Sequence, residues 1–394
     1  MLSSLPAYEF FAPPRIVFGW GRRSELGNLV RGLGRRAFLI SGSRTLDQNG
    51  VIESLLDDLK SVGIDSIRCA AITHEPEVSD VDQLVNQLRA SSITDGDFVI
   101  AVGGGSAIDL AKAVSALLTN THGSSVLDFL EGVGKGLKIE QQPLPLVVLP
   151  TTSGTGSEAT KNAVISSYSP PFKKSLRSDM MVPKLVLIDP ELSVSVPAAV
   201  TAATGMDALT QLIESNISCR AKPIPQALCQ RGLEGVVAAL RRAFHQPDDR
   251  PARELLAQSA LLSGMALANS GLGVAHGIAA ALGVHCRVPH GLACAMLLPT
   301  AIRVNAEASQ VELARVMTVM TGRNWASPRA AIEAGLDTIT NLLDELKIPR
   351  RLSAVGVQSS QLPAIVQSSH GNSLDGNPRK ISDVELLEIL ESLQ

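Results

Sequence analysis

Two histidines and an aspartate in the second half of the chain are residue types that hold metals. His276 stands in the segment GVAHG, and His290 stands fourteen residues later in VPHG. Asp207 lies in a predicted helix around residues 204–215, and Gln211 follows one turn later on the same face. Imidazole and carboxylate donors together suit Fe²⁺ or Zn²⁺. Each residue alone also fits a structural role, His276 as a hydrogen-bonded core histidine and Asp207 as a helix cap or ion-pair partner.

A glycine turn in the first half has the form of a phosphate-binding site. The predicted strand 98–102 runs into Gly103-Gly104-Gly105-Ser106, and a helical pattern follows at once. Glycines let backbone N–H groups approach a phosphate, and the helix dipole favours its negative charge. Ser106 and Asp109 also match a capping box. Because Ile108 stands where the last glycine of GxGxxG would be, this is not the ordinary dinucleotide fingerprint. The alternative is a tight turn whose glycines serve geometry alone.

A second turn follows the same logic. The predicted strand 146–149 leads into residues 150–158, PTTSGTGSE, which combine small hydroxyls with two glycines. Ligands bind at the carboxyl ends of strands in open α/β sheets, whereas a serine- and threonine-rich loop with local caps is the alternative. Two such turns in one sheet predict a dinucleotide site.

The elements that carry these residues divide the chain in two. Short apolar runs alternate with helical segments up to about residue 190, which predicts a doubly wound parallel α/β domain over residues 1–190. Beyond it, only helical periodicity is found, which predicts an all-helical domain over residues 191–394. The predicted strands are 37–40, 67–72, 98–102, 146–149 and 185–188. The predicted helices of the second half are 198–218, 224–243, 252–269, 272–282, 292–305, 308–320, 328–346 and 382–393.

Composition excludes several classes of function. The net charge is −3 and aromatic residues make up 3% of the 394 residues, so we expect no nucleic-acid partner and no anionic membrane surface. Five cysteines without CxxC spacing argue against a disulfide framework. No run reaches the roughly 18–20 apolar residues of a membrane span, and the N-terminus does not read as a signal peptide. We therefore expect a cytoplasmic protein.

Five segments occur in an order that resembles a known family. They are GGGSAIDLAKA, PTTSGTGSEAT, ATGMDALTQLIES, GLGVAHGIAAALG and VPHGLACAMLLP. Together they look like the iron-containing (group III) alcohol dehydrogenases, and the resemblance covers nearly the whole chain. It implies the dehydroquinate synthase-like fold and hydride transfer between the nicotinamide of NAD(P) and an alcohol or carbonyl carbon. A divalent metal, Fe²⁺ or Zn²⁺, would polarise the substrate oxygen.

The resemblance also assigns residues. It places the cofactor at Ser43, Gly104, Gly105, Ser106, Asp109, Thr151, Thr152, Thr155 and Lys173. It places the catalytic metal at Asp207, His276 and His290, with Gln211 as a neutral or absent fourth ligand. The partner it implies is a small alcohol or aldehyde, and we also expect a homo-oligomer, a dimer.

Three positions depart from the family pattern. Gln211 replaces a ligand histidine, Ala280 replaces a further histidine, and residues 41–44, SGSR, lack the acidic residue that contacts the adenosine ribose. The first departure leaves open a metal-independent reductase of the maleylacetate reductase type. A non-catalytic nucleotide-binding relative is the third alternative. Because a carboxylate near the ribose favours NAD and an arginine accommodates the 2′-phosphate, we expect NADP(H) to be accepted.

Overall fold

A computed structural model describes residues 7–394 of the chain, which form two compact units. One unit holds residues 12–152 and 157–196. The other holds residues 153–156 and 197–394, together with the described residues up to Phe11. The α/β and helical parts predicted from the sequence are both found.

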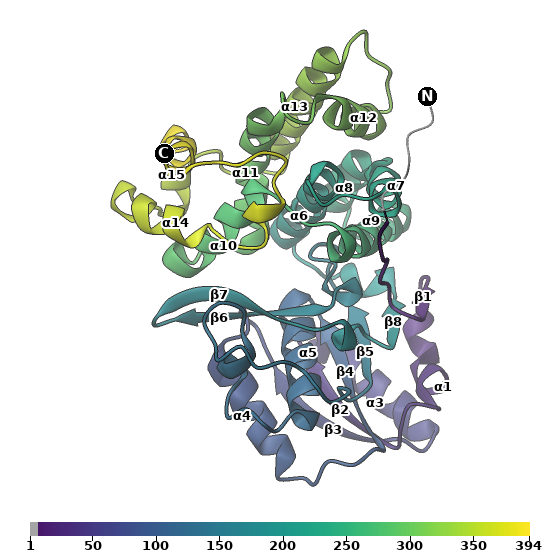
Figure 1. The fold of residues 1–394 in the computed structure, drawn as a ribbon. Helices are drawn as coiled ribbons and strands as arrows, with labels where there is room; N and C mark the ends of the chain where they lie inside the picture. Colours follow the sequence, from purple (N-terminus) through teal and green to yellow (C-terminus); the bar gives the residue numbers. More distant parts are fainter. Residues whose placement is uncertain (1–6) are drawn as a thin grey trace. The chain divides into compact units, whose positions relative to one another are not determined.

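The first unit is built on a parallel sheet of six strands in the order β1-β8-β5-β4-β2-β3 (Figure 1). The strands are β1 (Ile16–Phe18), β2 (Arg36–Ser41), β3 (Asp65–Ala71), β4 (Asp97–Gly103), β5 (Leu146–Pro150) and β8 (Leu185–Ile188). The five predicted strands are confirmed, with ends that differ by one or two residues.

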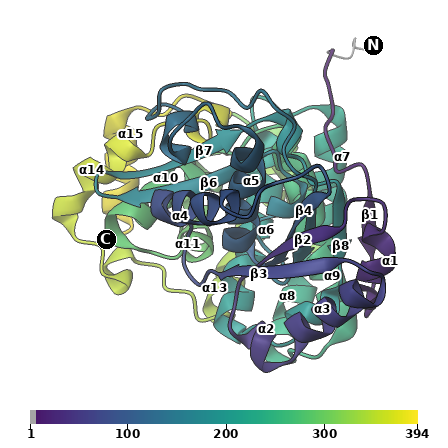
Figure 2. The same cartoon turned by 90° about the horizontal axis from the view of Figure 1, so that it is seen from below.

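Helices cover this sheet on both faces (Figure 2). Phe38 and Val99 face one hydrophobic core, which includes α4 (Val78–Arg89) and α5 (Gly105–Thr119). Their neighbours Leu39 and Ile100 face the other core, which includes α1 (Leu26–Val30) and α3 (Val51–Ser61). Successive side chains of a strand point to opposite faces, so a strand buried on both sides must be continuously apolar. This explains why the strands are short uninterrupted apolar runs. The short helix α2 (Thr45–Gln48) follows β2.

An antiparallel hairpin in this unit was missed by the sequence reasoning. It pairs β6 (Asn162–Tyr168) with β7 (Pro171–Arg177). The strand β7 carries Lys173 and Lys174 and is mostly half-exposed, so it lacks the apolar run that revealed the sheet strands.

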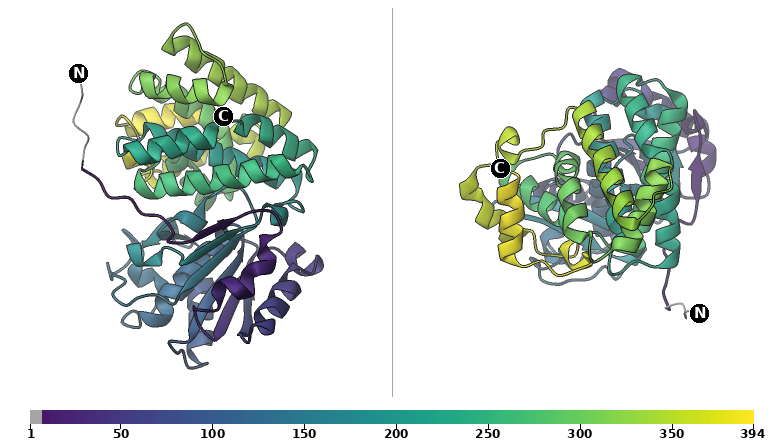
Figure 3. Two further views of the ribbon diagram at one scale, coloured as in Figure 1. Left: turned by 90° about the vertical axis from the view of Figure 1, so that its right-hand side faces the viewer. Right: turned by 90° about the horizontal axis from the view of Figure 1, so that it is seen from above.

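The regular elements of the second unit, over its described residues, are all helical (Figure 3). They are α6 (Ala198–Ile217), α7 (Pro223–Leu233), α8 (Val236–His245), α9 (Arg250–Asn269), α10 (Val274–Cys286), α11 (His290–Asn305), α12 (Gln310–Thr321), α13 (Pro328–Glu345), α14 (Leu362–Ser368) and α15 (Asp383–Ser392), with short 3-10 turns between some of them. The single helix predicted over 224–243 is wrong: it is two helices, because Gly235 takes a left-handed conformation with φ of 72° and ends the first. The helix α14 was not predicted.

Among residues 7–394, no single helix is both long and apolar enough to cross a membrane. The helices α9 and α10 reach that length and composition only as a pair bent by 99°.

The strand order creates one position suited to a ligand. The chain runs outward from β2 to β3, then returns to β4 beside β2 and continues outward to β5 and β8 on the other side. In such sheets the crevice at the carboxyl ends of the two strands where the order reverses is the ligand site. Residues 41–44 begin at the last residue of β2 and residues 103–106 at the last residue of β4, so both predicted cofactor segments stand at this reversal.

Glycines allow the two segments to approach each other. A Cβ on Gly103 would lie 2.7 Å from the Cβ of Ala107 and 3.0 Å from the Cα of Gly42. Such distances are too short for real carbon contacts, and the obstructing atoms belong to the backbone or to a rigid methyl group. The close approach of β2 and β4 at their carboxyl ends therefore requires glycine at position 103.

We expect Gly103→Ala to lower the free energy of unfolding by on the order of 1–3 kcal/mol, because the added methyl group overpacks this contact. Gly32→Ala is the matched control, since no atom lies within 4 Å of the Cβ it would add. Urea denaturation of both variants measures the difference. Equal stability of Gly103→Ala and the wild type would contradict the close approach.

Candidate cofactor and metal sites

The N-terminus of α5 is an uncapped helix end at the ligand position of the sheet. Gly104 holds the N-cap position with φ of −78° and ψ of −170°, and as a glycine it has no side chain to cap the helix. The predicted capping box of Ser106 with Asp109 is therefore wrong, because the helix already begins at Gly105 and Ser106 lies within its first turn. Uncapped N–H groups and the positive end of the helix dipole together make an anion site. This arrangement suits a pyrophosphate.

The second predicted turn lies against the first. The N–H of Thr151 donates to the carbonyl of Gly103 at 3.0 Å. A Cβ on Gly104 would lie 3.1 Å from the Oγ1 of Thr152. The structure thus brings Thr151 and Thr152 to the phosphate turn. Thr155, in contrast, belongs to the helical unit, where its carbonyl accepts a hydrogen bond from the side chain of Gln211.

Asp109 is directed into the α/β unit and helps to fix α5. Its Oδ2 accepts the N–H of Val164 on β6 at 3.2 Å, and burial raises the pKa of this carboxyl to about 6. Lys112, one turn later, donates to Thr160 Oγ1 at 2.7 Å and to the carbonyl of Asn162 at 3.0 Å, and burial lowers its pKa to about 8. These contacts tie α5 to β6. A direct cofactor contact by Asp109 stays a prediction.

The other two predicted cofactor residues have protein partners. Lys173 on β7 forms an ion pair with Glu75, with 2.6 Å between Nζ and Oε1. The Oγ of Ser43 accepts the N–H of Thr45 at 3.0 Å. Their cofactor contacts also stay predictions.

The predicted metal ligands meet inside the helical unit. Asp207 lies on α6, His276 on α10 and His290 on α11, and α11 packs against both of the other helices (Figure 1). The Nε2 of His276 lies 3.3 Å from the Oδ1 of Asp207, and the Nε2 of His290 lies 3.9 Å from the same oxygen. A fourth residue, Cys294, joins them, with its Sγ 3.7 Å from His290 Nε2. All four ligand atoms lie within 4.8 Å of one another.

These separations fit a metal ion. Zinc binds nitrogen, oxygen and sulfur at about 2.0–2.3 Å, and in a tetrahedron such bonds separate the ligand atoms by roughly 3.3–3.8 Å. The three distances among Asp207, His276, His290 and Cys294 fall in or next to that range. The mixture of imidazole, carboxylate and thiol donors is also one that Zn²⁺ and Fe²⁺ accept. The residues present therefore fit a divalent metal.

Glu214 aims the imidazole of His276 at this cluster. Its Oε2 accepts from His276 Nδ1 at 2.7 Å and from the N–H of Gly273 at 3.0 Å, and its Oε1 accepts from the N–H of Ala275 at 2.8 Å. With the proton on Nδ1, the lone pair of Nε2 faces Asp207. A carboxylate behind a ligand histidine is typical of metal sites, where it fixes the ring and its tautomer.

The sequence reasoning missed Glu214, although a signal was present. Asp207, Gln211 and Glu214 stand at positions i, i+4 and i+7, which share one face of a helix. Cys294 was also missed, although it stands four residues after His290 and therefore on the same face of that helix. The cysteines were predicted only to be reduced, mostly buried thiols.

The residues of the cluster shift one another's pKa values. Burial opposes the ionisation of Asp207, but the neighbouring histidines outweigh it and hold the pKa of that carboxyl below its usual range. Burial opposes protonation of His276, but Cys294, Asp207 and Glu214 outweigh it and raise its pKa. Burial raises the pKa of the Cys294 thiol to about 12. A bound cation reverses this protonation, because metal-bound thiols are deprotonated and ligating imidazoles are neutral.

Gln211 faces α9 and the turn at residues 153–156. Its Nε2 donates to the carbonyl of Thr155 at 3.2 Å, and its Oε1 accepts from the hydroxyl of Ser263 at 2.9 Å. Because the carbonyl of Thr155 can only accept a hydrogen bond, the NH₂ end of the Gln211 amide must face it. Both ends of this side chain thus have a partner within the protein, and metal ligation by Gln211 stays a prediction.

Two glycines permit the helices to bring these groups together. A Cβ on Gly291 would lie 2.5 Å from the carbonyl oxygen of Ala203, so α11 can approach α6 only with glycine beside His290. A Cβ on Gly273 would lie 2.9 Å from Glu214 Oε1. Gly291, next to His290, and Gly273, three residues before His276, are therefore required for steric reasons.

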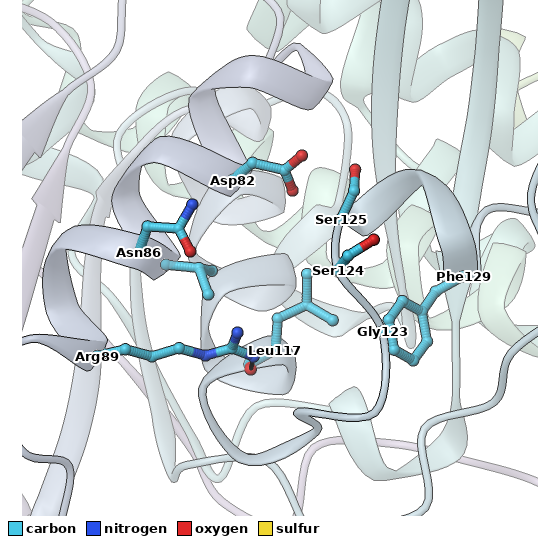
Figure 4. Close-up of a pocket in the computed structure, with 9 residues that line it drawn as sticks. Asp82, Asn86, Arg89, Leu117, Gly123, Ser124, Ser125 and Phe129 are labelled. Carbon is cyan, nitrogen blue, oxygen red and sulfur yellow. Dashed lines mark hydrogen bonds between the residues drawn. The ribbon is translucent and has the colours of Figure 1, made fainter.

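A small depression elsewhere in the α/β unit does not belong to either site. It lies between α4 and the segment around Ser124, near the C-terminal end of α5 (Figure 4). It encloses about 10 Å³, which is about the space that one water molecule needs. Its polar groups support the fold: Asp82 accepts the N–H of Val126, and Arg89 donates to the carbonyl of Leu117.

Comparison with known families assigns both parts of the chain to one family. The model of the family described as iron-containing alcohol dehydrogenase matches residues 13–190, and that of the Fe-containing alcohol dehydrogenase family, C-terminal, matches residues 201–394. The chain belongs to the iron-containing alcohol dehydrogenase family. It is therefore an oxidoreductase that acts on CH–OH donors, as the motifs predicted.

Relatives and solved structures of this family match along the whole chain. Sulfoacetaldehyde reductase of Bilophila wadsworthia (strain 3_1_6) is 31% identical and covers 98% of this chain and 99% of its own. The probable alcohol dehydrogenase EutG of Escherichia coli (strain K12) is 32% identical, and the match covers 98% of this chain and 94% of EutG. A crystal structure of 1,3-propanediol oxidoreductase has a TM-score of 0.90 at 30% identity and covers 99% and 100%. A structure of sulfoacetaldehyde reductase from Bifidobacterium kashiwanohense in complex with NAD+ has a TM-score of 0.85 at 27% identity, over 98% and 99%.

We expect Glu214→Gln to weaken zinc binding by about 10- to 100-fold, the usual cost of losing a supporting group behind a ligand. A glutamine has one acceptor oxygen for the four N–H groups that now donate to Glu214. Competition with a chromophoric chelator measures the affinity.

Glu333→Gln, on the exposed face of α13, is the control for this experiment. Unchanged zinc affinity in Glu214→Gln would show that Glu214 does not hold His276 for a metal.

Proposed function

We propose that this protein transfers hydride between NAD(P) and a small alcohol or aldehyde at a site that holds a divalent metal through Asp207, His276 and His290. The observation that carries the proposal is the buried cluster itself. His276 and Asp207 are each almost fully buried, and burying such groups together is costly unless they are paired or coordinate a metal. The orientation of His276 by Glu214 supports coordination.

When bound, the nicotinamide cofactor exchanges the hydride and the metal withdraws charge from the substrate oxygen. The chain's own residues supply the remaining functions. The N–H groups at the start of α5 bind the pyrophosphate, while Thr151 and Thr152 line the adjoining turn. Asp207 and His276 are held rigidly, because α11 packs against both α6 and α10 and Glu214 on α6 accepts hydrogen bonds from the start of α10. A rigid donor set keeps the site organised before substrate arrives, which is what electrostatic catalysis requires.

The charges near β2 favour NADP(H). Arg44 follows β2 directly and is exposed. The nearest acidic residue along the chain, Asp47, is neutralised by an ion pair with Arg68, with 2.5 Å between the charged atoms. The segment therefore presents a positive charge where a ribose 2′-phosphate would bind. This supports use of NADP(H) in addition to NAD(H).

The metal is expected to be required for hydride transfer. Stripping with a chelator should abolish alcohol oxidation and aldehyde reduction, and Zn²⁺ or Fe²⁺ should restore both. His276→Ala should lose metal and activity together, by about 100-fold or more in affinity, because a ligand costs more than the supporting group behind it. Metal content by mass spectrometry and a panel of alcohols and aldehydes provide the measurements.

His285→Ala is the control on the same helix, because that side chain bonds Ser368 outside the cluster. Full activity of the metal-free protein and of His276→Ala would contradict the requirement for a metal and favour a metal-independent reaction of the maleylacetate reductase type. If no substrate supports hydride transfer with any of the metals, the proposed enzymatic activity is wrong.

We expect Arg44→Ala to raise the KM for NADPH roughly tenfold or more and to leave the KM for NADH unchanged. A hydrogen bond to a charged group contributes about 1.5–3 kcal/mol, and only NADPH carries the phosphate. Steady-state kinetics with both cofactors measure this, with Arg31→Ala, another exposed arginine, as the control. Strict use of NADH by the wild type would contradict the assignment.

A further inference from the structure

We propose that Cys294 is the fourth protein ligand of the metal and takes the place that Gln211 would fill. This inference rests on the metal site of the proposed function. It adds a thiolate to a donor set otherwise made of nitrogen and oxygen, and so it concerns which metal the site holds and how strongly.

The geometry carries the assignment. Cys294 follows His290 by four residues on α11, so both side chains leave the same face of the helix. Its Sγ lies 3.7 Å from His290 Nε2, against roughly 3.3–3.8 Å expected between two ligand atoms of a zinc tetrahedron. Its exposed fraction is 0%. The sulfur has the position of a ligand atom toward Asp207, His276 and His290 alike, since all four atoms lie within 4.8 Å.

Gln211 is used for a different purpose. Its amide links α6 to Ser263 on α9 and to the carbonyl of Thr155. Turning the amide oxygen toward the cluster would break the hydrogen bond from Ser263 and leave its hydroxyl to the bond it already makes with the carbonyl of Ala260. The chain therefore has a ready sulfur donor one turn from His290 and an amide that already has two partners.

A thiolate changes the chemistry of the site in a defined way. With Asp207 and Cys294 both ionised, two negative charges face a divalent cation, compared with one if Gln211 were the fourth ligand. Soft thiolate ligands favour zinc over magnesium or manganese. Zinc can expand to five ligands during catalysis, so four protein ligands still leave room for a substrate.

Cobalt substitution tests the assignment without relying on activity. The purified full-length protein is stripped with a chelator and loaded with one equivalent of Co²⁺, and its near-ultraviolet absorption is recorded. A sulfur-to-cobalt charge-transfer band is expected in the wild type. It should vanish in Cys294→Ser, whose affinity for Co²⁺ should fall by about 10-fold or more.

Two variants keep the result specific. Gln211→Ala and Cys219→Ser, which changes an exposed cysteine on another segment, should both retain the band, and circular dichroism checks that each variant is folded. If the wild type binds one equivalent of cobalt that His276→Ala loses, yet shows no band, Cys294 is not a ligand and the proposed metal site stands. A band that survives in Cys294→Ser also overturns the assignment. If the wild type binds no cobalt, the ligand assignment and the proposed metal site both fall.

Discussion

The proposed metal site depends on the hydrogen bonds that the carboxylate of Glu214 accepts. It accepts four hydrogen bonds at the start of α10, three from backbone N–H groups and one from the ring of His276. One group therefore satisfies the helix end and fixes a ligand's tautomer. A buried carboxylate is stable only when it is fully paired, and here those pairs are what place His276 against Asp207. The glycine at 273 leaves the space that this carboxylate occupies.

The cofactor site depends on a different constraint, which is the absence of side chains. Gly103 and Gly104 let the carboxyl ends of two strands and the turn after β5 come within contact distance. The N-terminus of α5 is then left uncapped at the reversal of the strand order. An anion can bind there because the N-cap residue, Gly104, has no side chain that could accept from those N–H groups. The proposed metal site thus depends on the paired carboxylate of Glu214, whereas the predicted cofactor site depends on the N–H groups at the start of α5.

Sequence patterns predicted the residues that carry chemistry better than those that support them. Asp207, His276 and His290 were predicted because their motifs, taken in order, resemble those of the family, and the structure brings their side chains together. Glu214 was missed because its partners at the start of α10 are about sixty residues away in the sequence, so its helical spacing from Asp207 does not reveal the hydrogen bond to His276. Cys294 was missed because a buried thiol is usually inert core. The hairpin of β6 and β7 escaped detection because its half-exposed strands lack a continuous apolar run, and Gly235 breaks a helix whose apolar spacing continues across it.

The central claim is that a divalent metal binds among Asp207, His276 and His290. Anomalous diffraction at the zinc absorption edge, from crystals grown with Zn²⁺ and NAD(P)H, tests it most directly. The account predicts one strong peak at about 2.0–2.3 Å from the Oδ1 of Asp207 and from the Nε2 atoms of both histidines. A zinc peak elsewhere, with His276 and Asp207 bonded only to each other and to Glu214, would contradict it.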